Sequence, residues 1–330
     1  MKNEMPTKSV TAWAPATIGN VAVGFDILGM AIEGVGDQIR LTPRRDRKIM
    51  IQSITGVLTS SELPLDAEKN TAGAALIALQ EGEGLKVGFD VHIHKGIPLG
   101  SGMGGSAASA VAAVIAAQKW LSKKLSVKQK LFYALEGERV ASGAAHPDNV
   151  APCLMGGLVL ASLKFGEPIV ELPFPSMMGW MLVHPNIKVE TKLARSILKP
   201  QIDLSMHVEQ SSYLSCFLSG LYKNDLSLIQ QGFQDILIEP QRAALIPNFE
   251  RIKKQALALK GVLGFSISGS GPSLFSLTRN KLVAKKLAHQ VQQEFLRNGI
   301  ESQIYYGQGG SPGARIMPGS RKSHKKEPQG

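Results

Sequence analysis

Apolar and polar residues alternate strictly over 87–94, where Val87, Phe89, Val91 and Ile93 fall on one side of an extended chain. This period of two predicts a half-buried strand. Similar but shorter patterns predict strands at 10–17, 37–42, 48–54, 157–163, 168–172, 180–184 and 302–306. Over 264–277 the sequence predicts a strand, a Ser/Gly turn and a second strand.

Helical patterns lie between these strands, at 71–80, 106–121, 126–142, 191–197, 206–222, 225–236, 249–259 and 280–297. Ser126 is a suitable N-cap for the third of them. Both halves of the chain mix strands and helices without strict alternation, which favours the α+β class.

At roughly 150 residues per domain, a chain of 330 residues predicts about two domains. The segment PFPSMMG over 173–179 contains two prolines and a glycine, which favour a boundary at about 165–178. We therefore predict an N-terminal nucleotide-binding domain at 1–170, a C-terminal α+β domain at 171–314 and a basic, disordered tail at 315–330.

Composition narrows the function classes. With 44% hydrophobic and 19% charged residues, the chain has enough apolar material for a sizeable core. It contains no apolar run of about 18 residues and begins without an apolar signal segment. The cysteines are Cys153 and Cys216, too few for a disulfide framework, so we expect a cytoplasmic protein.

The net charge of +11 is partly due to the basic tail. A basic surface can bind nucleic acid. However, the tail lacks interleaved aromatic residues, and no nucleic-acid motif occurs elsewhere. We expect an anionic substrate and no nucleic-acid or membrane partner.

The strongest chemical signal is a glycine-rich loop between a predicted strand and a predicted helix. Its glycines let consecutive backbone N–H groups converge on one anion, and the helix adds the positive end of its dipole. Such a loop suits a triphosphate, and Ser106 at the helix start can offer a hydroxyl to a magnesium ion. The segment comprises Pro98, Leu99, Gly100, Ser101, Gly102, Met103, Gly104, Gly105, Ser106, Ala107, Ala108 and Ser109.

Other interpretations of this loop are weaker. Gly100, Gly102 and Gly105 satisfy the dinucleotide pattern, but that fold needs an acidic residue about 20 positions later, where the sequence is the basic LSKKL. The Gly-Lys-Ser/Thr of a Walker A loop and the protein-kinase signatures are missing. A loop that only turns the chain remains an alternative.

Four segments resemble the GHMP kinases, the superfamily of galactokinase, homoserine kinase, mevalonate kinase and phosphomevalonate kinase. The glycine loop and GFSISGSGP over 264–272 resemble superfamily motifs. APATIGNVAVGFD over 14–26 and HPDNVAP over 146–152 resemble homoserine kinases in particular. The first of these departs from the family pattern at Ile18, Ala22 and Val23.

The resemblance implies a two-domain α+β fold with the active site in the cleft between the domains. It implies ATP-dependent phosphorylation of the side-chain hydroxyl of L-homoserine to O-phospho-L-homoserine, a step of threonine biosynthesis, with ATP as co-substrate and Mg²⁺. The alternatives are a sister kinase for another small alcohol and a non-catalytic metabolite sensor on the same fold. A homodimer is left open.

The resemblance also assigns residues to the substrate. Arg195 and Arg242 would bind its carboxylate, and Asp26 its ammonium group. Thr191 lies four residues before Arg195 and so on the same helical face. Asn20 and Asn149 would contact the hydroxyl, and His146 would line the pocket.

The same comparison implies catalysis by positioning and electrostatics, with Asn149, Arg195 and Thr191 as the catalytic group, because an amide cannot take up the alcohol proton. Asp148 is an alternative base, although alternation along an extended segment would point it away from Asn149. For magnesium the resemblance implies Ser106 and Glu138. Glu136 competes with Glu138, since the two cannot share one helix face.

Two assignments stay open at this stage. Asn70 precedes a predicted helix, so it would either cap that helix or contact adenine. The glycine turn at 268–271 would either close over the phosphate site or pack beside the first glycine loop.

Overall fold

The computed structural model describes residues 8–142, 146–164 and 168–318. The first sheet has the order β11-β1-β2-β4-β3, and β5 and β6 extend it from β2. Strands β3 and β4 run parallel, and the other pairs are antiparallel. Its strands are β1 (Val10–Gly19), β2 (Leu28–Arg44), β3 (Ile49–Gly56), β4 (Gly88–Lys95), β5 (Leu158–Ala161), β6 (Ile169–Leu172) and β11 (Arg315–Ile316).

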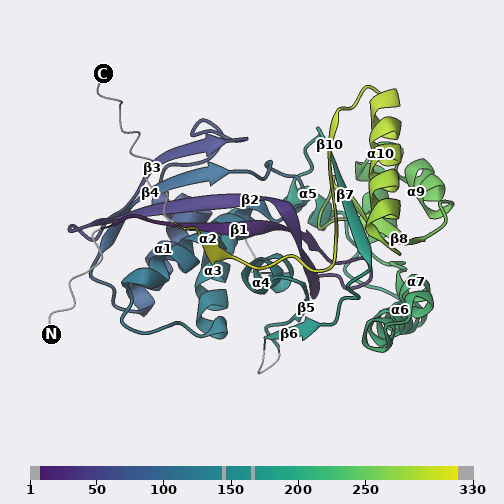
Figure 1. Ribbon diagram of the computed structural model, residues 1–330, viewed down its shortest axis with the longest axis horizontal. Coiled ribbons are helices and arrows are strands. Elements are labelled where there is room, and N and C mark those ends of the chain that lie inside the picture. Colours follow the sequence, from purple (N-terminus) through teal and green to yellow (C-terminus); the bar gives the residue numbers. More distant parts are fainter. Residues whose placement is uncertain (1–7, 143–145, 165–167, 319–330) are drawn as a thin grey trace, which may run out of the picture.

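Four helices cover one face of this sheet (Figure 1): α1 (Thr71–Gly82), α2 (Gly105–Ala117), α3 (Val127–Ser142) and α4 (Pro147–Met155). Helix α2 is mostly alanine and is buried from Ala107 to its end, because small side chains let it pack closely on β1 and β2. Ser126 precedes α3 as the predicted N-cap, and it forms a capping box with Gln129 through hydrogen bonds between side chain and backbone in both directions.

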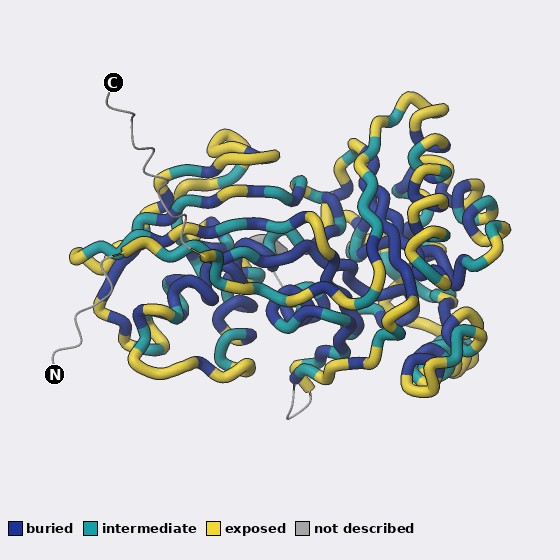
Figure 2. The backbone as a smooth tube through the Cα atoms, viewed as in Figure 1, coloured by how far each residue is buried: buried dark blue, intermediate teal, exposed yellow. Residues whose placement is uncertain are grey.

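The second sheet is antiparallel, with the order β10-β7-β9-β8. Helices α9 and α10 pack on it around a separate hydrophobic cluster, and Figure 2 shows buried residues along the inner strands. The elements are β7 (Gly179–Pro185), β8 (Val262–Ile267), β9 (Leu274–Thr278), β10 (Ser302–Gln308), α5 (Thr191–Ser196), α6 (Leu204–Lys223), α7 (Leu226–Gly232), α8 (Glu239–Arg242), α9 (Phe249–Leu257) and α10 (Lys281–Arg297).

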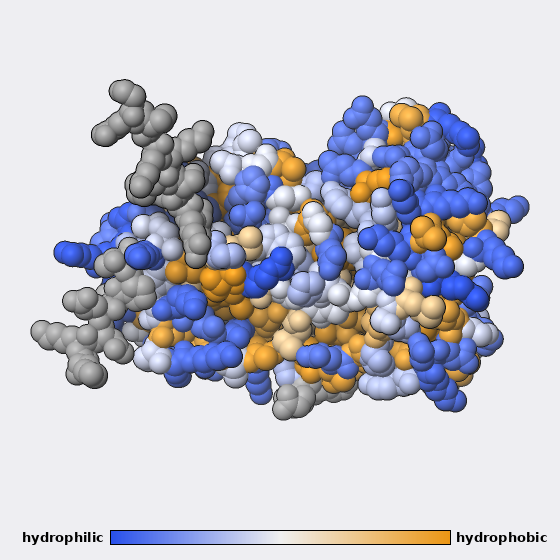
Figure 3. All heavy atoms as spheres, viewed as in Figure 1, coloured by the Kyte–Doolittle hydropathy of each residue, from blue (hydrophilic) through white to orange (hydrophobic). Residues whose placement is uncertain are grey.

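The surface in Figure 3 is mostly hydrophilic over the C-terminal part, while hydrophobic residues gather along the lower half of the view. Among the described residues, no helix is both long enough and apolar enough to span a membrane. We propose a domain boundary near residue 170, which the separation of the chain into two sheets supports.

Three predicted elements need correction. The segment after His146 is the helix α4 rather than an extended chain, because Pro147 occupies the first helical position. Helix α7 ends at Gly232, before the predicted 236, because the Asp235 carboxylate accepts backbone N–H groups of the next turn. The predicted tail does not begin at 315, since Arg315 and Ile316 pair with β1.

Candidate active site

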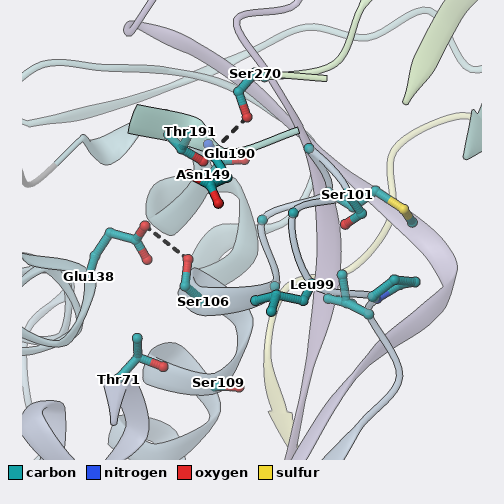
Figure 4. Close-up of a pocket in the computed structure, with 18 of the residues that line it drawn as sticks. Thr71, Leu99, Ser101, Ser106, Ser109, Glu138, Asn149, Glu190, Thr191 and Ser270 are labelled. Carbon is teal, nitrogen blue, oxygen red and sulfur yellow. Dashed lines mark hydrogen bonds between the residues drawn. The ribbon is translucent and has the colours of Figure 1, made fainter. Parts of the chain in front are cut away.

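One cavity of about 460 Å³ collects nearly all of the predicted site residues. Its walls come from the glycine loop, the start of α2, α3, α4, the segment at 188–195 and the turn at 269–270. Figure 4 shows the Ser106, Glu138, Asn149 and Thr191 side chains around it. Of the predicted residues, only Ala107 and Ala108 are not part of the lining; they are fully buried on the core side of α2.

The glycine loop has the backbone that an anion cradle requires. Gly100, Gly102 and Gly104 all have positive φ, between 63° and 72°, a conformation that glycine adopts without strain. Gly104 is the N-cap of α2 and offers no side-chain hydrogen bond. The first N–H groups of α2 therefore face the cavity without a capping side chain, and they can receive an anion.

Ser106 and Glu138 meet beside this loop. The Ser106 hydroxyl donates a hydrogen bond of 2.9 Å to Glu138 Oε1, drawn as a dashed line in Figure 4. Burial raises the pKa of Glu138 to about 7. The competing Glu136 instead forms a surface pair with Arg139. The oxygens of Ser106 and Glu138 are hard ligands of the kind that magnesium binds together with water and phosphate oxygens.

In the same cavity, Asp26 and Arg195 form a bidentate ion pair. Arg195 Nη1 and Nη2 donate to the two carboxylate oxygens of Asp26 at 3.0 and 2.8 Å. The family resemblance assigns these two residues to opposite ends of a substrate, whereas here they form hydrogen bonds with each other. His146 Nδ1 lies 3.5 Å from Asp26, and burial lowers the pKa of His146.

Arg242 is the second predicted arginine, and it is only 3% exposed. Its guanidinium donates to the carbonyls of Ala194 and Gly269. Both arginines lie over the ring of Phe25, with Arg242 5.2 Å and Arg195 5.3 Å from its centroid. The stacking holds two cations on one wall of the cavity.

The three predicted amide side chains have different surroundings. Asn70 caps α1, accepting from the N–H groups of Ala72 and Gly73, so the capping role is the one observed and the adenine role stays a prediction. Asn20 holds the turn of the first motif by accepting from Asp26 N and donating to Gly269 O. Asn149 accepts a hydrogen bond of 2.7 Å from Thr17.

The glycine turn at 268–271 packs beside the first loop. Ser268 Oγ donates to Gly102 O at 2.7 Å, and Gly269 N donates to Gly19 O at 3.1 Å. The predicted Thr191 lies across from this turn, 3.4 Å from Ser270 Oγ. The turn therefore ties the glycine loop to the first motif.

The sequence patterns miss the lysines that line the cavity, which are Lys69, Lys95, Lys188 and Lys192. Lys95 ends β4 beneath the loop and donates to Asp37, to Ser109 Oγ at 3.0 Å and to Gly105 O at 2.8 Å. Lys188 also lines the cavity, beside Gly100. The alternation along β4 could have identified Lys95, because it lies two residues after Ile93 and therefore on the same, buried side of the strand.

Asp148 also lies in the site, contrary to the expectation that it points away. Both Asp148 and Asn149 approach Gly19, where an added side-chain carbon would lie 2.8 Å from Asp148 Oδ2 and 2.9 Å from Asn149 Nδ2. In a helix, consecutive residues are only about 100° apart, so both can reach the same wall. Burial and the charge of Asp26 raise the pKa of Asp148 to about 7.

Known proteins resemble this chain over most of its length. Residues 70–157 match the family model "GHMP kinases N terminal domain", and 217–298 match "GHMP kinases C terminal". The homoserine kinase of Xanthomonas campestris pv. campestris (strain B100) is 43% identical over 310 residues, 94% of each chain. That of Xylella fastidiosa (strain M12) is 43% identical over 306 residues, 93% of each chain.

Solved structures share the fold. The homoserine kinase of Cytophaga hutchinsonii ATCC 33406 has a TM-score of 0.90 and 41% identity, covering 96% of this chain and 99% of that one. The L. major mevalonate kinase in complex with R-mevalonate has a TM-score of 0.68 at 14% identity, covering 92% and 97%, which shows a shared fold alone. From its matched domains and its full-length relatives, the chain belongs to the homoserine kinase family of the GHMP kinases.

Proposed function

We propose that this protein transfers the γ-phosphoryl group of ATP to the side-chain hydroxyl of L-homoserine, giving O-phospho-L-homoserine for threonine biosynthesis. One observation carries the proposal. A single cavity joins a glycine loop built for phosphates to a wall with one carboxylate and two guanidinium groups, Asp26, Arg195 and Arg242. That wall matches a small zwitterion, and the bound hydroxyl would lie toward the phosphates.

The phosphate side uses backbone N–H groups, a helix N-terminus and lysines. The loop and the first turn of α2 would hold the ATP phosphates, with Lys188 adding positive charge. Lys95 is already paired with Asp37 and would support the loop from beneath through Gly105 O. This preorganised positive field stabilises the charge of the transferring phosphoryl group. Asn70 also lines this cavity, and its contact with adenine remains part of the proposal.

Ser106 and Glu138 would hold Mg²⁺. The pair fits that ion because it supplies two oxygen ligands beside the phosphate cradle and leaves the other positions to water and phosphate oxygens. Bound there, the ion would neutralise charge on the phosphates. Among the described residues, no cluster of three or more His, Cys, Asp or Glu side chains could hold a metal without such help.

On binding, the substrate would replace the ion pair between Asp26 and Arg195 with its own contacts to both residues. Its carboxylate would take the guanidinium groups of Arg195 and Arg242, and its ammonium group would take Asp26. A ligand with only one of these charges would leave either Asp26 or Arg195 partly unpaired, which is costly once the bound ligand displaces water from the site. The free-state pair of Asp26 and Arg195 therefore favours a zwitterion over a simple carboxylate.

In the transfer step, the bond from the γ-phosphorus to the ADP oxygen breaks and a bond to the homoserine oxygen forms. The hydroxyl proton leaves late, to a phosphate oxygen or water. Asn20 and Asn149 would orient the hydroxyl, and Thr191 and Arg195 would stabilise charge from the other wall. His146 would line the substrate pocket rather than act as base.

A coupled assay of ADP release tests the proposal, with homoserine, mevalonate, galactose and shikimate as acceptors. Homoserine should be the best acceptor, while homoserine methyl ester and N-acetylhomoserine should be poor ones. Equal turnover of mevalonate, which has a carboxylate but no ammonium group, would identify a sister kinase instead. ATP binding without turnover of any acceptor would favour a metabolite sensor.

We also propose a cytoplasmic location, which two unpaired cysteines, Cys153 and Cys216, support. A homodimer stays a prediction, and gel filtration with light scattering measures it.

A further inference from the structure

Thr17 lies where three sequence motifs meet. It is fully buried near the end of β1. Its backbone N–H donates to Met103 O in the glycine loop at 3.0 Å. Its hydroxyl donates to Asn149 Oδ1 on α4 at 2.7 Å. Gly104 packs directly against this hydroxyl, since a side-chain carbon on Gly104 would lie 2.1 Å from Thr17 Oγ1.

This hydroxyl decides which end of the Asn149 amide is engaged by the protein. An asparagine amide has an accepting oxygen and a donating nitrogen, and Thr17 uses the oxygen. Within the described part of the chain, Asn149 Nδ2 has no hydrogen-bond partner. The amide lies against Gly19, where an added carbon would be 2.9 Å from Nδ2 and 3.1 Å from Oδ1. The close packing leaves it little freedom to swing away.

We propose that Thr17 is a positioning residue for the phosphoryl transfer. It holds the amide of Asn149 so that Nδ2 serves as the donor toward the reacting oxygens. This inference rests on the proposed function of the site. In Figure 4 Asn149 is drawn between Thr191 and the Ser106–Glu138 pair, and all four residues line the same cavity.

The orientation of the amide matters because one end donates hydrogen bonds and the other end accepts them. With Nδ2 toward the reactants, the amide stabilises the negative charge that develops on the transferring group and on the accepting oxygen. If the amide turned over, its oxygen would repel the same charge. A hydroxyl donor at Oδ1 makes the productive orientation the stable one, and a methyl group in its place would not.

The test compares four variants with the wild-type protein: Thr17→Val, Thr17→Ser, Asn149→Ala and the double change Thr17→Val/Asn149→Ala. Valine keeps the shape of threonine but removes the hydroxyl, and serine restores the hydroxyl. Thr11→Val is the matched control, because Thr11 lies on the same strand, six residues before the Thr17 hydroxyl that bonds Asn149. The readouts are kcat, the KM for ATP and homoserine, and Tm.

Loss of one neutral hydrogen bond predicts a fall in kcat of roughly 3- to 10-fold for Thr17→Val. The KM for ATP should stay within about twofold, because the glycine loop is held through the Thr17 backbone rather than its hydroxyl. Thr17→Ser should recover most of kcat. In the Asn149→Ala background, Thr17→Val should cause no further loss, because no amide remains to be oriented.

A second measurement does not depend on turnover. The side-chain amide signals of Asn149, assigned by their absence in Asn149→Ala, should shift or broaden in Thr17→Val and return in Thr17→Ser. Unchanged amide signals in Thr17→Val, or effects on kcat that multiply in the double variant, would overturn the inference. If the wild-type protein does not phosphorylate homoserine, the proposed function fails instead, and the amide signals still decide the role of Thr17.

Discussion

Replacing Asp37 by asparagine should destabilise the protein strongly, because it removes the carboxylate that neutralises the buried Lys95 in the network beneath the glycine loop. The Lys95 side chain is 5% exposed and that of Asp37 is fully buried. Asp37 Oδ1 also accepts from the N–H groups of Gly96 and Ile97. Asparagine can still accept those two bonds through its oxygen, but its NH2 group would replace the oxygen that accepts from Lys95 and from Ser109 Oγ.

Breaking a buried ion pair by removing one partner costs about 3–5 kcal/mol, a large part of a typical stability of about 5–15 kcal/mol. With a urea slope of about 3 kcal/mol per molar, the unfolding midpoint should fall by roughly 1–2 M. Adding Lys95→Met to Asp37→Asn should recover part of the loss, because the unpaired charge is then gone.

Asp90→Asn is the matched control. Asp90 pairs with Arg44 on the exposed part of the same sheet, where both side chains are more than a quarter exposed. Such surface pairs contribute about 0–1 kcal/mol, so the midpoint should hardly move. A loss below about 1 kcal/mol for Asp37→Asn, or no recovery on adding Lys95→Met, would refute the reasoning.

The remaining predictions concern pH and substrate binding. The pKa of Glu138 is about 7, and magnesium needs the carboxylate form. The magnesium concentration that gives half-maximal activity should therefore fall from pH 6 to pH 8 in the wild type and in Glu136→Gln, but not in Glu138→Gln. Burial lowers the pKa of His184 from 6.5 to about 4. Between these pH values the unfolded state therefore binds more protons than the folded state. The free energy of unfolding should rise with pH across this range, by roughly 3 kcal/mol in total. Urea titrations across that range should show the slope in the wild type and in His207→Gln, and a flatter one in His184→Gln. Arg242→Ala should weaken homoserine binding roughly 10- to 150-fold in equilibrium titrations and leave ATP binding unchanged.

Local chemistry made much of the site predictable. Four glycines before a helix need no tertiary information to suggest a phosphate cradle, and Ser106 follows directly from the helix start. Glu138, Asp26 and Arg195 came from resemblance to a family, since each is an ordinary polar residue in its local sequence. The structure brings these residues to one cavity, while their roles remain proposals.

The parts that escaped prediction depend on contacts between distant segments. Asp37 and Lys95 both occupy buried positions of their strands, and extending the β2–β4 register by one residue sets them opposite each other. Either residue alone reads as a break in an apolar pattern, and only the pairing of strands explains both. The helix at Pro147 was missed because a short segment with two prolines gives little helical signal.

The pairing of β11 with β1 has a consequence for the order in which the protein can be completed. Arg315 stacks on Trp13, 4.3 Å from its ring centroid, and Met317 N donates to Thr11 O. A ribosome that has made the other strands of the first sheet must still synthesise well over a hundred residues before this last strand emerges. Until then β1 presents an open edge, a template for pairing with another nascent chain. A chain cut before residue 315 should therefore aggregate during synthesis, even though every residue of the cavity is present.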